Sequence, residues 1–221
     1  MERVIDARQL ADEIASRLAA LSSRTTPAAR SVRREYSRLL AKTAPDTVIR
    51  VGIGLASRSE FACRFVGYEI VKYHKGAAAS LTPSQILELG QGIDGWGAVD
   101  CFACDLSGPA LRDGLLSDAM IRGWACSDDR WWRRAALVST VALSRRGDAA
   151  DVRSATEICS LAVNDRDDMV VKALSWALRE LAKKHAKEVR RFLRQHEGKL
   201  ASRVVREVRN KITTGLKNPR R

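Results

Sequence analysis

The sequence has few of the residues that mark turn-rich or membrane-spanning proteins. Only 5 Pro and 14 Gly occur in 221 residues, so collagen-like chains, long linkers and turn-dense all-β folds are not expected. The longest apolar run, Ala135 to Leu143, is interrupted by Ser139 and Thr140 and is much shorter than the roughly 20 residues of a membrane helix. The first residues are charged and lack the apolar core of a secretion signal. We therefore expect a soluble cytoplasmic protein that does not bind a membrane.

Cysteine is scarce and its number is odd, which argues against a disulfide framework. Of the five cysteines, Cys101 and Cys104 form a C-x-x-C pair without a second pair elsewhere. The residues around this pair have a helical pattern, in which cysteines pack as small apolar residues; a metal or redox role is the less favoured alternative. The three histidines, His74, His185 and His196, have no ligand spacing. No metal and no cofactor are expected.

Acidic residues are outnumbered, and the basic excess is concentrated near the C-terminus. The chain has 39 Lys and Arg against 26 Asp and Glu, a formal net charge of +13. From Arg179 onward there are 15 basic and four acidic residues, so this segment alone carries +11. Such asymmetry indicates a polyanionic partner, most often nucleic acid. The alternative is a solvated basic tail without a partner.

Helical periodicity dominates what remains. Apolar residues recur at i, i+3 and i+4 along most of the chain. Ser31 is a predicted N-cap, and Ser57 with Glu60 and Thr82 with Gln85 have the spacing of capping boxes. The alternating segment 51–55 has no second strand to pair with, so we interpret it as a short helix.

The predicted helices form pairs, and the pairs repeat. The second helix of each pair is expected to start near residues 59, 95, 130, 168 and 201, which gives steps of 33 to 38 residues. Acidic residues precede the helices at 130 and 168 and favour their positive N-terminal ends. The prediction is an all-α, HEAT-like repeat solenoid of stacked antiparallel helix pairs with a concave basic face. We expect one domain over 1–221, with a helical cap at 1–45, repeats at 46–216 and a basic tail at 217–221.

Tryptophan stands out in a chain with only 5% aromatic residues. Trp96 precedes Asp100 by four residues, so both side chains would share one face of a helix. A carboxylate beside an indole suits a groove that receives a cationic group, because an unpaired buried charge is costly. The alternative is that Asp100 pairs with a nearby arginine and ties two repeats together.

Three segments resemble the AlkD-like DNA alkylation repair glycosylases. Residues 93–100 hold a Trp-x-x-x-Asp motif, residues 130–137 resemble a W-x-x-R-A-A block, and residues 172–180 resemble a K-A-[IL]-x-W-x-L-R-E block. The helix that starts at Glu60 and Phe61 and ends at residues 73–75 is also similar. The resemblance covers residues 58–196 and implies a HEAT-like repeat fold.

The resemblance also implies site residues. Asp100 would be the catalytic carboxylate, Trp96 and Trp176 the catalytic indoles, and Arg134 a DNA-contacting residue. Three neighbouring cations are expected to bind DNA beside it: Arg133, Lys172 and Arg179.

The sequence departs from the family pattern at two glycines and at its N-terminus. Gly95 and Gly97 stand where the family often has a second Trp and another acid. Residues 1–55 show no clear counterpart of the family's N-terminal helices. These departures affect the expected substrate range more than the expected fold.

The resemblance implies a monofunctional DNA glycosylase of base excision repair in the bacterial cytoplasm or nucleoid. It would hydrolyse the N-glycosidic bond of cationic N3- or N7-alkylated purines in double-stranded DNA, as a monomer and without a deep base-flipping pocket. One alternative is a non-enzymatic HEAT-like solenoid that binds distorted or branched nucleic acid. Another is a protein-binding HEAT scaffold.

Overall fold

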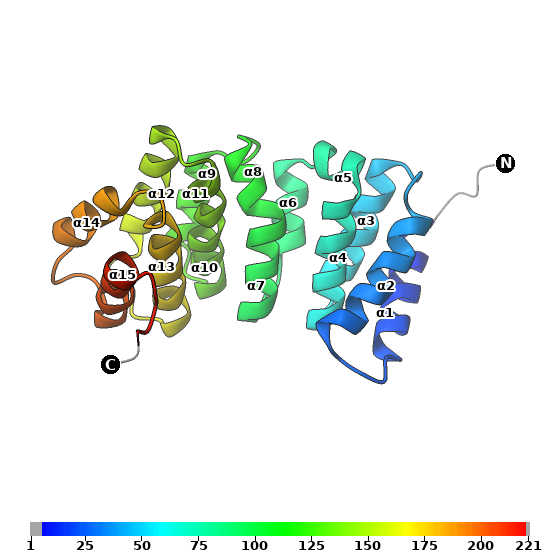
Figure 1. Cartoon of the computed structure of the whole chain (residues 1–221). Helices are drawn as coiled ribbons and strands as arrows, with labels where there is room; N and C mark the ends of the chain where they lie inside the picture. Colours follow the sequence, from blue (N-terminus) through cyan, green and yellow to red (C-terminus); the bar gives the residue numbers. More distant parts are fainter. Residues whose placement is uncertain (1–5, 220–221) are drawn as a thin grey trace. The chain divides into compact units, whose positions relative to one another are not determined.

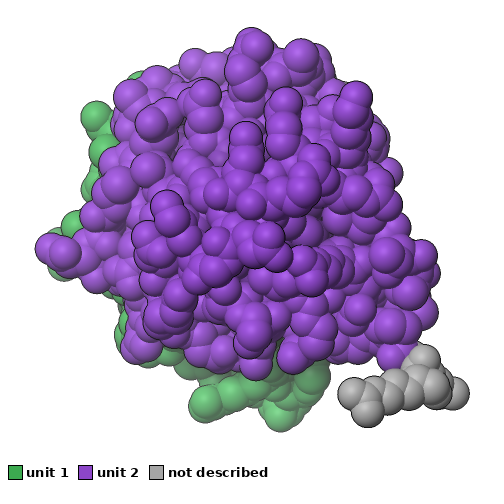
Figure 2. All heavy atoms as spheres, turned by 90° about the vertical axis from the view of Figure 1, so that its left-hand side faces the viewer, with its two compact units in different colours: residues 1–106 green, residues 107–221 purple. Residues whose placement is uncertain are grey.

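The computed structural model describes residues 6–219, apart from the side chain of Arg146, and every regular element in that range is helical (Figure 1). The chain forms two compact units, residues 1–106 and 107–221 (Figure 2). Parts of the predicted N-terminal cap (residues 1–5) and of the predicted basic tail (Arg220 and Arg221) lie outside the described residues. Within 6–219, no helix combines the length and the apolar composition needed to cross a bilayer.

The first unit is built from two layers of helices. Helices α1, α3 and α6 follow one another in one layer, and α2, α4 and α7 follow one another in the other. Helices α3 and α4 make the most extensive contact between the layers. The elements are α1 (Ala7–Ala19), α2 (Thr26–Leu39), α3 (Pro45–Ala56), α4 (Phe61–Tyr73), α5 (Lys75–Ser80), α6 (Pro83–Gly90) and α7 (Trp96–Phe102).

Two layers of helices also form the second unit. Helices α9, α12 and α14 pack in succession, as do α10, α13 and α15. A π-helical turn, η1 (Ala103–Ser107), ends at the first residue of this unit and precedes α8, and a 3₁₀ turn, η2 (Thr140–Ala142), follows α10. The helices are α8 (Gly108–Arg112), α9 (Asp118–Ala125), α10 (Arg130–Ser139), α11 (Leu143–Arg146), α12 (Ala149–Leu161), α13 (Asp168–Leu181), α14 (Ala186–Gln195) and α15 (Ser202–Thr214).

The predicted starts of the second helices are confirmed to within two residues. They begin at Phe61, Trp96, Arg130, Asp168 and Ser202. At α10 and α13 the preceding aspartates cap the helix, since each carboxylate accepts a hydrogen bond from a backbone N–H of the first turn. The sequence therefore located these helix N-termini through their acidic start signals.

Two start signals are wrong and two local predictions are confirmed. Ser31 lies inside α2, which begins at Thr26 because Pro27 suits the first helical turn. Ser57 ends α3, and Glu60 precedes α4 without a side-chain capping bond, so these two residues form no capping box. The Thr82 capping box is present in full, and segment 51–55 belongs to the twelve-residue helix α3.

Two buried hydrogen bonds in the second unit join segments that lie about one helix pair apart in the sequence. The Ser107 and Ser139 hydroxyls are 2.7 Å apart, and Ser175 donates to Glu207 at 2.6 Å; both pairs are buried and separated by 32 residues. Each bond satisfies polar groups that would otherwise be costly inside a helical core. The single continuous repeat domain and its concave basic face stay predictions.

Candidate functional site

Helix α7 presents Trp96 and Asp100 on one face. Trp96 is its first residue and 62% exposed, and Asp100 is half-buried one turn later. The residues that anchor α7 lie on the opposite face and are buried: Ala98, Val99 and Phe102. This pattern confirms the predicted placement of the indole and the carboxylate on one face of a helix within the first unit.

The two glycines beside Trp96 have different surroundings. A Cβ atom at Gly97 would lie 3.1 Å from Cε2 of Phe61, so a larger residue there requires the Phe61 ring to move. A Cβ atom at Gly95 would meet nothing within 4 Å. At position 97 the resemblance implies an acid, but this chain has a glycine that packs against an aromatic ring of α4. Position 95 has room for a side chain.

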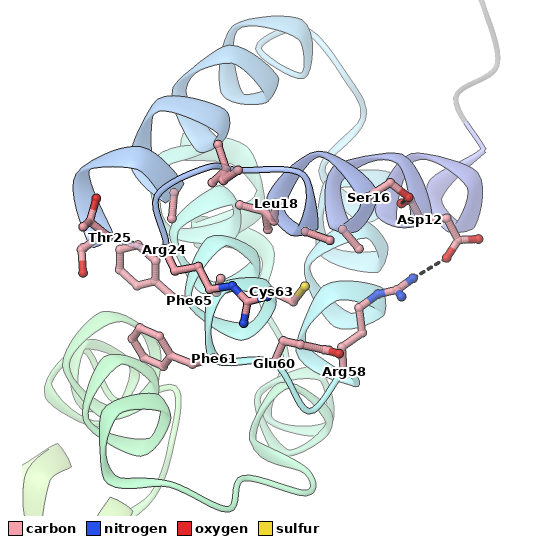
Figure 3. A pocket seen from close by; sticks show the side chains of 16 residues that line it. Asp12, Ser16, Leu18, Arg24, Thr25, Arg58, Glu60, Phe61, Cys63 and Phe65 are labelled. Carbon is pink, nitrogen blue, oxygen red and sulfur yellow. Dashed lines mark hydrogen bonds and ion pairs between the residues drawn. The ribbon is translucent and has the colours of Figure 1, made fainter.

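A cavity of about 890 Å³ adjoins the start of α4 in the first unit (Figure 3). Leu18, Cys63 and Phe65 contribute to its apolar wall, and Arg24 and Glu60 contribute charged groups. Phe61 also lines it, so the ring that contacts Gly97 is shared between the cavity and the α7 face. This cavity was not predicted from the sequence. The available signal was the four-residue spacing of Phe61 and Phe65, whose ring centroids lie 5.8 Å apart.

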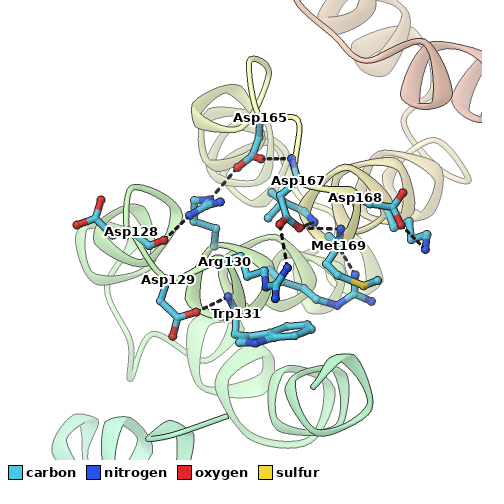
Figure 4. Close-up of polar contacts among 12 residues, drawn as sticks. Asp128, Asp129, Arg130, Trp131, Asp165, Asp167, Asp168 and Met169 are labelled. Atoms are coloured by element: carbon cyan, nitrogen blue, oxygen red, sulfur yellow. Dashed lines mark hydrogen bonds and ion pairs between the residues drawn. The ribbon is translucent and has the colours of Figure 1, made fainter. Parts of the chain in front are cut away.

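Arginines of α10 fix the segments around the start of α13 (Figure 4). Arg133 donates from Nε to Asp165 at 2.7 Å and from Nη1 to the carbonyl oxygens of Ser127 and Asp128, both at 2.9 Å. Arg134 is 5% exposed, and its Nη1 donates to the carbonyl oxygen of Met169 at 2.6 Å. Both predicted DNA-contact residues thus make internal contacts that hold loops and helices in place.

The two cations predicted on α13 are also engaged. The Lys172 ammonium lies 2.6 Å from a carboxylate oxygen of Asp168, and this hydrogen bond is the main reason that the pKa of Asp168 is lowered. Arg179 donates to the hydroxyl of Ser175 at 3.3 Å and lies 3.9 Å from buried Glu207. Lys172 is the more exposed of the two cations, with 42% of its side chain accessible.

Indole rings occur on both long helices of this region. Trp176 is half-buried on α13. Trp131 is also half-buried and lies under the Arg130 guanidinium, 5.1 Å from the ring centroid, while Arg130 reaches Asp167 at 3.3 Å. The structure thus brings Arg133, Arg134 and Lys172 to the N-terminal part of α13, with Trp176 further along the same helix. The convergence of this group with Trp96 and Asp100 stays a prediction.

The first cysteine of the C-x-x-C pair is shielded by burial. Burial raises the pKa of Cys101 to about 12, which keeps the thiol protonated at neutral pH. Among residues 6–219, no group of three or more His, Cys, Asp or Glu side chains is placed to hold a metal ion.

Comparison with known proteins gives one result. The family model described as DNA alkylation repair enzyme matches residues 21–212. No curated protein and no solved structure matches the sequence significantly. The match extends beyond the predicted range 58–196 at both ends, so the expectation that residues 1–55 lack a counterpart is wrong for residues 21–55.

Proposed function

Because the chain belongs to the DNA alkylation repair enzyme family, we propose that it is a monofunctional glycosylase that releases N3- or N7-alkylated purines from double-stranded DNA. The observation that carries the proposal is the face of α7, where the exposed Trp96 and the carboxylate of Asp100 lie one helical turn apart. A cationic lesion is the ligand for which an indole face and a carboxylate are jointly complementary.

The proposed reaction uses the charge of the lesion itself. The bond from C1′ to the purine nitrogen breaks, and its electron pair neutralises the cationic base as it leaves. Positive charge then develops on the sugar, where the Asp100 carboxylate would stabilise it and orient a water molecule toward C1′. The water oxygen bonds to C1′, and its proton passes to Asp100 and then to solvent. Trp96 and Trp176 would hold the cationic nucleoside through their ring faces, each contributing on the order of 0.5–2 kcal/mol.

Backbone phosphates need exposed cations, and the predicted DNA-contact residues differ in this respect. Lys172 is accessible enough to reach a phosphate by exchanging its contact with Asp168. Arg133 and Arg179 have only 21% and 16% of their side chains exposed, and Arg134 is buried. We therefore propose Lys172 as a phosphate contact and assign the three arginines primarily to positioning α13.

The test is release of labelled bases from methylated duplex DNA by the purified protein. We expect the parent protein to release methylpurines without strand cleavage. Asp100→Asn should lower the single-turnover rate at least about a hundredfold, because the carboxylate charge acts in the transition state. Asp94→Asn is the matched control: Asp94 is an exposed acid just before α7, and its loss should leave the rate unchanged.

The second candidate function is non-enzymatic binding to distorted DNA. It is favoured by Gly97, because the resemblance implies an acid at this position and the chain has a glycine there, next to the ring of Phe61. Tight binding to branched or methylated duplexes without any base release by the parent protein would establish this alternative. Equal rates for the parent protein and Asp100→Asn would contradict the catalytic role of Asp100.

A further inference from the structure

Helix α14 carries a row of cations on its outer face. Val189, Phe192 and Leu193 are buried and anchor the helix in the second unit. On the opposite face, four exposed basic residues follow the spacing i, i+3, i+4 and i+7, which places them in one line along the helix. We name this row the α14 basic stripe: Lys187, Arg190, Arg191 and Arg194.

The cations of the stripe differ from most others in the second unit. Arg122, Lys183 and Arg203 each lie within 3 Å of a carboxylate oxygen. Within the described residues, no member of the stripe has an ion pair or a side-chain hydrogen bond. The acid of α14, Glu188, lies three residues before Arg191, and no ion pair joins it to the stripe within the described part of the chain. The stripe is therefore a line of positive charge without a paired carboxylate among the described residues.

Such a line is unfavourable for the protein alone. Like charges at i, i+3 and i, i+4 repel one another and destabilise a helix. The stripe extends over about 10 Å, since each helical residue rises about 1.5 Å. Successive phosphates of one DNA strand advance about 3.4 Å along the duplex axis, so the length of the stripe corresponds to about three phosphate-to-phosphate steps along that axis. A polyanion with closely spaced charges would remove the repulsion.

The burial pattern favours nucleic acid over a lipid surface. A helix that binds a membrane interface needs an apolar face free for insertion beside its basic face. The apolar face of α14 is occupied, because Val189, Phe192 and Leu193 are all buried in the second unit. What α14 offers to a partner is charge alone, which suits a phosphate backbone.

We propose that the α14 basic stripe binds the phosphate backbone of undamaged duplex DNA and supplies salt-dependent, sequence-independent affinity. The proposal rests on DNA being the substrate of the proposed function. It assigns this affinity to a surface separate from the cations of α10 and α13, most of which are engaged in internal contacts. The stripe would hold the protein on DNA while the residues proposed for catalysis act at the lesion.

The test measures binding to undamaged duplex DNA over a range of salt concentrations. The variant Arg190→Gln with Arg194→Gln should reduce the slope of log K against log salt by about 2 and weaken binding in 0.1 M salt at least about tenfold, because each phosphate contact contributes about 0.9 to the slope. The matched control is Arg122→Gln with Lys183→Gln, which removes the same charge from ion-paired positions in the same unit. The control should change the slope by less than about 0.5.

Each outcome decides the proposal. Equal slope changes in the two double variants would show that net charge causes the salt dependence, and would overturn the role of the stripe. An unchanged slope in the Arg190→Gln, Arg194→Gln variant would also overturn that role. Lost binding to phosphatidylserine vesicles together with intact DNA binding would assign the stripe to lipid instead. Undamaged DNA requires no base release, so a protein without glycosylase activity can still confirm or refute the proposal.

Discussion

Tyr36 is a buried side chain whose hydroxyl depends on a neighbouring carboxylate. It is 5% exposed, and its hydroxyl donates to Oε1 of Glu13 at 2.7 Å, which joins α2 to α1. Burial, followed by this hydrogen bond, raises the pKa of Tyr36 to about 12 from its ordinary value of 10. A raised pKa in the folded state stabilises the fold fully below pH 10, and this contribution is lost as pH rises from 10 toward 12.

Tyr36→Phe should therefore cost stability in a pH-dependent way. At pH 8 the variant loses a hydrogen bond to a charged group, which lowers the free energy of unfolding by about 2 kcal/mol. Near pH 11.5 the parent protein has lost much of the stabilisation by Tyr36, so the difference in the free energy of unfolding between the parent protein and the variant should shrink. Urea unfolding at both pH values measures this difference. A difference that is constant with pH would contradict the assignment.

At the residue scale the candidate site is only partly predictable. The i, i+4 spacing of Trp96 and Asp100 was sufficient to place both on one helix face, because helix geometry is local. The burial of Arg134 against Met169 was not predictable from the sequence, because it depends on how close α13 lies to α10. The sequence around an arginine is the same whether its side chain contacts a phosphate or a backbone carbonyl.

At the scale of elements, the end of α11 is coupled to the start of α14. Gly147 ends α11 with φ +68°, a left-handed conformation that favours glycine. A Cβ atom there would lie 2.7 Å from Nε2 of His185, the residue that precedes α14. Gly114, after α8, has a similar φ of +79°, but a Cβ atom would meet nothing within 4 Å.

The two glycines separate backbone strain from side-chain contact. Gly114→Ala should lower the free energy of unfolding by about 1–2 kcal/mol, which is the cost of a left-handed residue with a Cβ atom. Gly147→Ala should cost about 1 kcal/mol more, because the ring of His185 must move as well. Chemical denaturation of both variants gives the comparison. Equal losses would show that His185 yields without cost.

Element starts were predictable where their signals are local. Asp129 and Asp167 cap α10 and α13 through their own side chains, so the sequence predicted both starts. Ser57 and Glu60 have the spacing of a capping box but belong to the end of one helix and the residue before the next. Spacing alone does not distinguish a capping box from a turn that happens to contain the same residues.

On the scale of the whole molecule, the five cysteines sample very different depths. Cys126 is exposed, Cys101 and Cys104 are half-buried, and Cys63 and Cys159 are buried. Burial raises the pKa of Cys159 to about 12 and raises that of Cys63 as well, so their thiolates are scarce at neutral pH. Thiol reactivity therefore reports on the folding of both units.

Thiol labelling of the native protein at pH 8 should show one rapidly reacting thiol, that of Cys126, whereas Cys101 and Cys104 should react slowly. Unfolding in guanidinium chloride should expose all five. Cys126→Ser should abolish the fast phase and leave the slow phases unchanged, because the other thiols are shielded by packing. Absorbance of the released chromophore of a disulfide reagent follows the reaction. Several fast thiols in the native protein would contradict the packing described.

The sequence by itself determined the helical fold class, the starts of the second helices and the shared face of Trp96 and Asp100. These features depend on periodicity, capping chemistry and spacing within one or two helical turns, all of which are local. Tertiary structure decided which cations are available: Arg133, Arg134 and Arg179 are engaged by segments up to 35 residues away, whereas the α14 basic stripe is not. Charge pairing depends on which helices become neighbours, and a one-dimensional pattern does not contain that information.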